Sequence, residues 1–349
     1  MRTDDLFIAG LATRIPKLQP VQEAVQQGSY DAERAAAEGW LSVAVAGSES
    51  APELAGAAAE SALKRSGLPV EAPALLLHAA TYHQGPDSWY AQHYIQHRVL
   101  GRTVPAIGLH QGCTGLLDGI QLAYGFLKVQ PGASAAVVTG ADNFGTPLLD
   151  RWNYGAGWLT NRGSVLGDAG SALVLSTEGG PLRIRSIGSC SLSEWEELYR
   201  GDVPIHPPAV TLGAPATLGL RMAAYTQKHP QASTQVAHAL TRARTELARQ
   251  TLAEAGVAPE DVTRVAHVFA GHRRYQAGLL KPLGIDPDRG VLEIGRRHGH
   301  LGVSDQIVGL DHLLDAGELG PGDTVLMISN GVGISVACAV VEVLERPTW

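Results

Sequence analysis

One pattern occurs twice along the chain, and this repeat constrains the fold more than any other feature. The helical segment after Cys113 ends at Pro131-Gly132, and the apolar segment AAVVTGAD follows. Much later, a helical segment ends at Pro321-Gly322 before the apolar segment TVLMISNG. Pro131 follows Cys113 by 18 positions (131 − 113), and the same offset before Pro321 falls at position 303. We therefore expect Gly299 to Ser304 to be the structural counterpart of the Cys113 corner.

Apolar strand segments alternate with helical segments along the whole length, which predicts an α/β fold. The repeat divides the chain into two expected halves, residues 1–178 and 179–349. In a duplicated α/β fold, pseudo-twofold symmetry places equivalent strand-end loops over one cleft, where ligands bind. We therefore expect Cys113, His272 and His300 to meet there, although they are far apart in sequence.

The cysteine at the first corner is a candidate nucleophile. Cys113 lies in a tight Gln-Gly-Cys-Thr-Gly turn between a strand segment and a helical segment. Free backbone N–H groups and the helix dipole favour a thiolate at such a helix start. The alternative is a buried structural cysteine, because free cysteines are mostly buried. Position alone does not separate these two readings.

Composition excludes several classes of protein. The 349 residues carry a net charge of −7 and no basic block, which argues against nucleic acid as a partner. Three widely spaced cysteines without a CxxC pair predict neither a disulfide framework nor a metal site, and they fit a reducing cytoplasm. The N-terminus does not resemble a signal peptide, and no apolar stretch reaches the ~18 residues of a spanning helix. We expect a cytoplasmic protein that does not insert into membranes.

Three motifs resemble β-ketoacyl-ACP synthase III and its relatives in the thiolase superfamily. They are QGCTGLLDGIQLA around Cys113, VLGDAGSALVL, and the ending PGDTVLMISNGVGISVACAVVEV. The resemblance implies a five-layered αβαβα fold, a homodimer, and transfer of an acyl group from a CoA or acyl-carrier-protein thioester onto Cys113. No permanently bound cofactor is implied. It also implies that the N–H of Cys113 and one from Gly331 to Gly333 stabilise the tetrahedral intermediate.

Two further expectations rest on the same resemblance. Trp40 stands near the place where the family has a tryptophan that stacks on the adenine of CoA. The dimer interface is expected to include a sheet edge near Ala135 to Ala141.

The chain departs from the family pattern at two positions. The family has His-Gln-Ala-Asn where this sequence has His272 followed by Arg-Arg-Tyr, and Gly-Asn where it has Gly299-His300. Asp305 follows His300 by five positions, at the expected start of a helix. Residues 286–300 are expected to form a polar connection that is rich in His and Arg and ends in RRHGH. His300 therefore has the alternative of a solvated loop histidine, and Asp305 that of a helix-end acid favoured by the dipole.

These departures lead to three functional hypotheses. The first is an acyltransferase of specialised metabolism, such as polyketide or other natural-product biosynthesis, in which Asp305 orients a histidine that activates a hydroxyl or amine of a small-molecule acceptor. The second is a decarboxylative condensing enzyme, in which His272 and His300 stabilise the enolate. The third is a non-catalytic ketosynthase partner subunit, and the retention of Cys113 argues against it.

Overall fold

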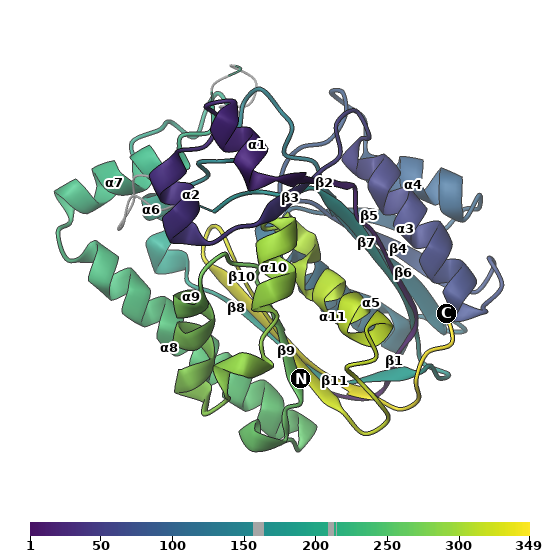
Figure 1. Cartoon of the computed structure of the whole chain (residues 1–349). Coiled ribbons are helices and arrows are strands. Elements are labelled where there is room, and N and C mark those ends of the chain that lie inside the picture. The colour runs from purple at the N-terminus through teal and green to yellow at the C-terminus, as the bar shows by residue number, and fades with distance from the viewer. Residues whose placement is uncertain (156–163, 209–212, 214) are drawn as a thin grey trace.

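The computed structural model describes residues 1–155, 164–208, 213 and 215–349 (Figure 1). Up to residue 176 the elements are β1 (Arg2–Arg14), β2 (Lys17–Pro20), α1 (Val21–Gln26), α2 (Ala32–Glu38), β3 (Ser42–Val45), α3 (Ala51–Ser66), β4 (Pro73–Ala79), α4 (Ala91–Val99), β5 (Ala106–Leu109), α5 (Gly115–Val129), β6 (Ala135–Asp142) and β7 (Ala169–Ser176). The later elements are β8 (Leu182–Ser191), α6 (Glu196–Arg200), α7 (Leu218–Lys228), α8 (Ala232–Ala255), β9 (Arg264–His267), α9 (Arg273–Leu280), α10 (Leu292–His298), α11 (Asp305–Asp315), β10 (Thr324–Gly331) and β11 (Ser335–Val343).

The large sheet has the same strand order on both sides of one junction. Its full order is β5-β4-β6-β7-β1-β8-β11-β10-β9, and β1 pairs with β8 at the junction. Outward from there, β1-β7-β6-β4 mirrors β8-β11-β10-β9. In both series the first two pairings are antiparallel and the last is parallel. Beyond β9, at the position that corresponds to β5 beyond β4, the second series has only one parallel bridge, between Val265 and Gly290. The expected α/β fold with duplicated architecture is confirmed.

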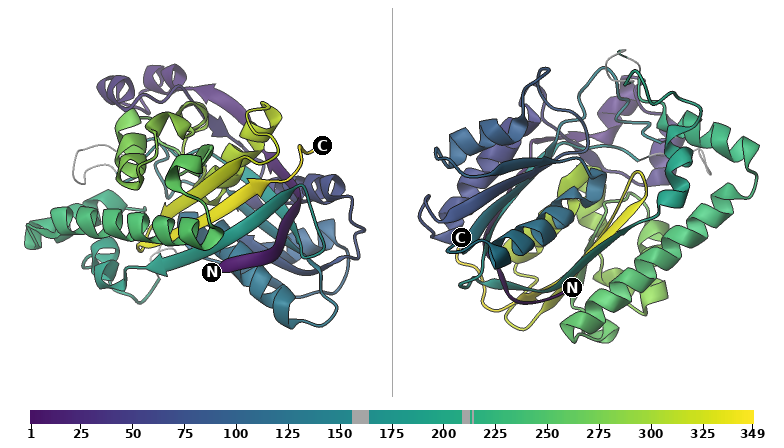
Figure 2. Two further views of the ribbon diagram at one scale, coloured as in Figure 1. Left: turned by 90° about the horizontal axis from the view of Figure 1, so that it is seen from below. Right: turned by 180° about the vertical axis from the view of Figure 1, so that it is seen from behind.

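Helices separate the sheet into layers. Helices α5 and α11 lie between the two halves of the sheet, while α3 and α4 cover one outer face and α8 and α9 the other (Figures 1 and 2). Three hydrophobic clusters correspond to these interfaces: one around α5 and α11, one under α3 and α4, and one under α8 and α9. This is the five-layered αβαβα arrangement that the resemblance implies.

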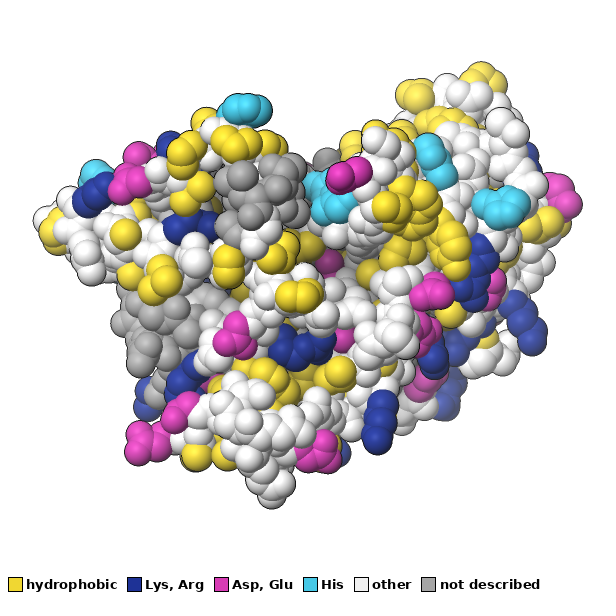
Figure 3. Space-filling model, turned by 90° about the horizontal axis from the view of Figure 1, so that it is seen from above, with side chains coloured by type: hydrophobic (Ala, Val, Ile, Leu, Met, Phe, Trp, Pro, Cys, Tyr) yellow, Lys and Arg dark blue, Asp and Glu magenta, His cyan; other side chains and the backbone are white. Residues whose placement is uncertain are grey.

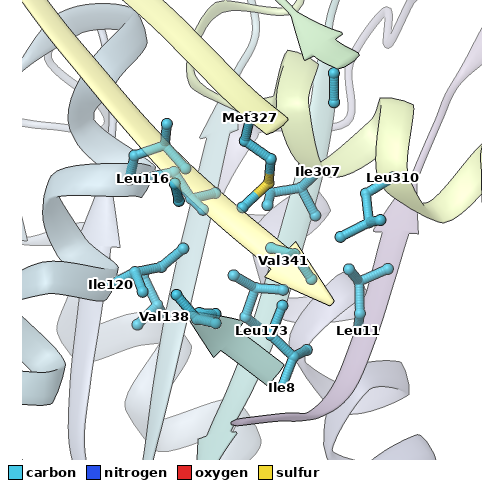
Figure 4. Packing of buried hydrophobic residues seen from close by; sticks show 14 of the residues in the cluster. Ile8, Leu11, Leu116, Ile120, Val138, Leu173, Ile307, Leu310, Met327 and Val341 are labelled. Atoms are coloured by element: carbon cyan, nitrogen blue, oxygen red, sulfur yellow. The ribbon is translucent and has the colours of Figure 1, made fainter. Parts of the chain in front are cut away.

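The strands supply both sides of each layer because successive side chains point to opposite faces. In β6, Val138 packs toward α5 whereas Val137 packs under α3. In β10, Met327 packs in the central layer whereas Leu326 packs under α8. Figure 4 shows the central layer, where side chains from α5, α11 and the strands of both halves interdigitate. Strands covered on both faces read as continuous apolar runs, which is why they were recognisable in the sequence.

The central layer is expected to dominate stability. Ile120 of α5 is fully buried there, whereas Leu122 of the same helix is 54% exposed. Ile120→Ala should lower the free energy of unfolding by ~2–5 kcal/mol, because the cavity cannot close between two rigid sheets. Leu122→Ala, the matched control, should stay within ~0.5 kcal/mol. Urea unfolding of both variants checks this, and equal losses would contradict the central role of this layer.

Two expectations about local structure are wrong. Strand β6 is not a sheet edge: it is paired with β4 and β7 and buried along its whole length, so the expected interface near Ala135 to Ala141 is excluded. Residues 286–300, expected to be a polar connection, contain the short helix α10, whose Ile294 is buried in the central hydrophobic cluster. The division at 178/179 falls between β7 and β8 and stays a prediction.

The described residues also bear on partners. None of their helices combines the length and apolar character that crossing a bilayer requires. On the face drawn in Figure 3, Lys and Arg side chains lie among Asp and Glu side chains. The expected cytoplasmic location stays a prediction.

Candidate active site

Cys113 lies in a one-turn 3-10 helix, Gly112–Thr114, between β5 and α5. Gly112 has φ of 56°, in the left-handed region that favours glycine, and a Cβ there would lie 3.2 Å from the Val332 side chain. The glycine thus lets the chain turn sharply beneath the strand ends of the other half. The thiol at this corner is 7% exposed and lines a cavity of 450 Å³.

The second corner has the same construction. A 3-10 turn at Gly302–Ser304 precedes α11, and Gly302 has φ of 60°. The Oγ1 of Thr114 lies 3.0 Å from the Oγ of Ser335, and the Oγ of Ser304 lies 2.8 Å from the Oγ of Ser171. Each corner hydroxyl therefore bonds to a serine on an antiparallel strand. By this correspondence Val303 occupies the place that Cys113 has in the first corner.

A hydrogen-bonded chain joins the two corners. The Nε2 of His300 lies 3.1 Å from the Sγ of Cys113, and its Nδ1 lies 2.6 Å from the Oδ2 of Asp305. All three side chains are buried. A thiol, an imidazole and a carboxylate in this order form the arrangement in which a base activates a nucleophile and a third group orients the base.

Asp305 is held firmly in this position. Its side chain is 0% exposed, and besides His300 it accepts hydrogen bonds from the N–H of Phe269 at 2.8 Å and of Leu301 at 2.7 Å. The carboxylate thus has three donors and is shielded from bulk solvent. Asp305 does begin α11, as the helix-end reading expects, but its buried contact with His300 goes beyond that reading.

The electrostatics of the site favour a protonated imidazole. Burial alone would lower the pKa of His300, but the negative charges of Asp305 and of Cys113, with hydrogen bonds to both, hold that pKa well above its usual range. His300 therefore carries its proton at neutral pH when Cys113 is a thiolate. It is not a solvated loop histidine, since it is buried between two acidic groups.

His272 lines the same cavity but does not join this chain. It precedes α9, and its Nδ1 accepts the N–H of Arg274 at 2.9 Å. A neutral imidazole that accepts at Nδ1 carries its proton at Nε2, so the ring is a hydrogen-bond donor on its other side. Among the described residues, no hydrogen bond joins His272 to Cys113 or His300.

The other residues singled out in the sequence lie around the cavity. Trp40 is 5% exposed and packs against Val43 and Trp152, which leaves little of its ring free to stack on an adenine. A Cβ on Gly331 would lie 3.2 Å from the backbone nitrogen of Cys113, so the turn after β10 runs directly against the nucleophile corner. Gly333 follows at φ of 96° in the same turn. Their expected roles in binding stay predictions.

Asp142 is a residue that the sequence reading missed. It lies at the end of β6, is buried, and accepts the N–H of Thr81 at 2.8 Å and of Val303 at 3.1 Å. Burial raises the pKa of Asp142 to about 6, although these hydrogen bonds oppose the rise. The carboxylate connects the first half to the corner that carries His300. Its signal was an acid at the carboxyl end of an otherwise apolar strand.

The described residues contain no group of three or more His, Cys, Asp or Glu side chains that could hold a metal ion. The cavity is instead lined by aromatic and polar side chains from both halves. They include Tyr154, Tyr199, Tyr275 and Asn330.

Comparisons with known proteins agree with this fold. The family described as 3-oxoacyl-(acyl-carrier-protein) synthase III C terminal matches residues 252–343. The structure of ChlB3, an acyltransferase, is 38% identical, with a TM-score of 0.90 over 99% of this chain and 100% of ChlB3. No curated protein matches the chain.

Two more distant structures share the fold. 3-Oxoacyl-(acyl-carrier-protein) synthase III from Aquifex aeolicus VF5 is 19% identical, with a TM-score of 0.76 over 97% of this chain and 99% of that one. A variant of OleA from Xanthomonas campestris is 17% identical, with a TM-score of 0.74 over 98% and 100% of the two chains.

Proposed function

Because the chain belongs to the β-ketoacyl-ACP synthase III-like enzymes of the thiolase superfamily, we propose that it is an acyltransferase that acts through Cys113. The donor is the thioester of CoA or of an acyl carrier protein, and the acceptor is a hydroxyl or amine of a small molecule. The observation that carries this proposal is the hydrogen-bonded chain from Cys113 through His300 to Asp305.

The first half-reaction loads the enzyme. The Cys113 thiolate attacks the thioester carbonyl, and the tetrahedral oxyanion requires donors such as the N–H of Cys113 and one from Gly331 to Gly333. When the carbon–sulfur bond of the donor breaks, the departing thiolate takes the proton from Nε2 of His300. The products are an acyl-Cys113 thioester, a neutral His300 and free CoA or carrier-protein thiol.

The second half-reaction uses His300 as a base. With the sulfur acylated, the lone pair at Nε2 faces the site, because Nδ1 donates its hydrogen to Asp305. An acceptor O–H or N–H gives its proton to this nitrogen as its oxygen or nitrogen attacks the acyl carbon. Cys113 leaves as the thiolate, and His300 retains the proton, which restores the starting ion pair.

The same tautomer supports acceptor transfer over condensation. To stabilise an enolate, His300 would have to donate from Nε2, but Asp305 fixes its neutral form with a lone pair there. In the cavity wall, His272 offers a neutral donor at Nε2, because its Nδ1 accepts the N–H of Arg274. Decarboxylative condensation therefore remains the alternative that requires a protonated His300. Retention of Cys113 within a bonded chain speaks against a non-catalytic partner subunit.

We propose that this acyl transfer is a step in the biosynthesis of a specialised metabolite. The support is the similarity to the acyltransferase ChlB3, which extends over nearly the full length of both chains. The test is intact-mass spectrometry with a panel of acyl-CoAs and acyl carrier proteins. A loaded enzyme should lose its acyl mass when hydroxyl or amine acceptors are added, with formation of an ester or amide. Discharge with malonyl donors alone would contradict the acceptor assignment.

The chain is proposed to form a homodimer through β5. This strand ends the sheet and pairs only with β4 among the described residues, and Ile107 within it is 49% exposed. An open edge of unpaired N–H and C=O groups favours pairing with a second strand. Two copies related by a twofold axis would extend the sheet through their β5 strands.

Light scattering at micromolar concentration should give the mass of two chains for the wild type and of one chain for Ile107→Lys, because a charge would be buried at the pairing edge. Val129→Lys, at a position 79% exposed on α5, is the control and should remain dimeric. A single-chain mass for the wild type would refute the dimer.

A further inference from the structure

The backbone of His300 is held by a segment from the other half of the chain. The N–H of His300 donates to the carbonyl of Val165 at 2.8 Å, and the N–H of Gly167 donates to the carbonyl of His300 at 2.9 Å. Together these bonds form an isolated parallel bridge between Leu166 and His300. The ring that faces Cys113 is therefore anchored on residues 165–167.

A buried ion pair fixes this anchoring segment. Asp168 is 0% exposed, and its carboxylate lies 2.9 Å from Nη2 of Arg151, a side chain that is 11% exposed. The N–H of Leu166 donates to the carbonyl of Arg151 at 2.8 Å, and Nη1 of Arg151 reaches the carbonyl of Leu166 at 3.4 Å. Arg151 thus bonds to Leu166 and to Asp168, the two residues that flank Gly167.

Asp168 also ties the segment to two other parts of the fold. Its Oδ2 accepts the N–H of Ala46, after β3, and its Oδ1 accepts the N–H of Phe144, after β6, each at 2.8 Å. With Arg151, three donors therefore converge on this carboxylate. Removing the charge would leave a buried guanidinium without its partner, which is a large perturbation at this point.

Packing transmits any shift of the segment to the base. A Cβ on Gly167 would collide with the carbonyl oxygen of His298, and one on Gly299 would lie 3.1 Å from the nitrogen of Gly167. The two backbones touch without an intervening side chain. A displacement of residues 165–168 must therefore move His300 as well, because close-packed atoms leave no free space to absorb the shift.

We propose that Arg151 and Asp168 are positioning residues that set the distance between His300 and the Cys113 sulfur. Neither side chain touches the reacting atoms. The proposal rests on the proposed pairing of His300 with Cys113, but not on the identity of the acyl group or of the acceptor.

Alkylation of Cys113 by iodoacetamide tests this without any substrate. The thiolate is the reacting form, so the rate follows its population across pH. In the wild type the imidazolium 3.1 Å from the sulfur should support rapid alkylation near neutral pH. In Asp168→Asn and Arg151→Met, the rate at pH 6.5 should fall about tenfold, because His300 moves away from the sulfur. Arg151→Lys, which keeps the charge, should recover part of this rate.

The other charged and titratable side chains around Cys113 and His300 are not substituted in these variants. They are Asp305 of α11, Asp142 of β6, and the phenols of Tyr82, Tyr154, Tyr199 and Tyr275. The matched control is Asp311→Asn, which breaks another largely buried ion pair, with Arg65, at the far end of α11. This control should lose stability but keep the wild-type profile.

Peptide mapping confirms which cysteine reacts, and thermal unfolding confirms that each variant is folded. If Asp168→Asn does not fold, Arg151→Lys and Arg151→Met decide the matter. Folded variants with the wild-type profile, or an equal loss of rate in Asp311→Asn, would overturn the positioning role alone. A wild-type profile that already matches a free thiol would overturn the pairing of Cys113 with His300, and the positioning proposal with it.

Discussion

Cys113→Ala is expected to abolish both the acyl adduct and acyl transfer. The thiol is the only nucleophile in the hydrogen-bonded chain of described residues, and without it the acyl group has no covalent carrier. In a serine protease, loss of the nucleophile lowers kcat by ~10⁶. We expect a loss of the same order here.

The measurement is intact-mass spectrometry after incubation with an accepted acyl donor, followed by peptide mapping. Cys190→Ala and Cys338→Ala are the controls. Cys338 is fully buried under α8, and burial raises the pKa of both thiols, so neither is suited to attack a thioester. An adduct that persists in Cys113→Ala, or that maps to Cys190 or Cys338, would refute the assignment.

The fold was largely predictable because its buried strands are apolar on both faces. Segments such as 135–139 and 325–329 were recognisable without knowledge of their neighbours, and the Pro-Gly breaks before them located the repeat. The order of the strands within the sheet was not predictable. Nothing local in AAVVTGAD distinguishes a central strand from an edge strand, so β6 was expected at a sheet edge, whereas the edge strand is β5.

Short polar helices were also hidden from the sequence. Helix α10 contains only seven residues, of which Ile294 and Gly295 are buried. A helix of this length has no stable periodic pattern and depends on tertiary contacts. The motif Arg-Arg-His-Gly-His therefore resembled a solvated connection, although it leads directly into the corner that carries His300.

The candidate site was partly visible for a different reason. The spacing of His300 and Asp305 places both at one corner, where a local contact is expected. The contacts of Asp142 with Val303 and of Asp168 with Arg151 join segments distant in sequence or topology, so no spacing rule identifies them. His272 remains a prediction as a catalytic group, since it lines the cavity but bonds to Arg274.

Asp305→Asn is expected to lower kcat by about 10²–10³ if the enzyme transfers its acyl group to a hydroxyl or amine. The corresponding change in a serine protease costs ~10⁴, because the imidazole adopts the wrong tautomer. We expect a smaller loss here, since a thiolate is intrinsically more nucleophilic than a hydroxyl. The loss should fall mainly on kcat, because Asp305 orients His300 and does not contact the substrate.

Stability must be separated from catalysis in this variant. Asp305 accepts two backbone N–H groups in addition to His300, so its replacement can also lower the free energy of unfolding by ~1–3 kcal/mol. Rates are therefore compared per folded molecule. Asp311→Asn on the same helix serves as the matched control, and it should leave kcat unchanged.

Release of labelled CO2 from carboxyl-labelled malonyl-CoA distinguishes the two chemistries. An acceptor transferase should carry a malonyl-type group intact, because no step generates an enolate, and neither the wild type nor the variants should release CO2 coupled to product. In a condensing enzyme His300 is instead the essential second donor, so His300→Ala would abolish CO2 release while Asp305→Asn would have little effect on it. Stoichiometric CO2 release that depends on His300 and is indifferent to Asp305 would therefore replace acyl transfer to an acceptor with decarboxylative condensation, even though the same three side chains remain in contact.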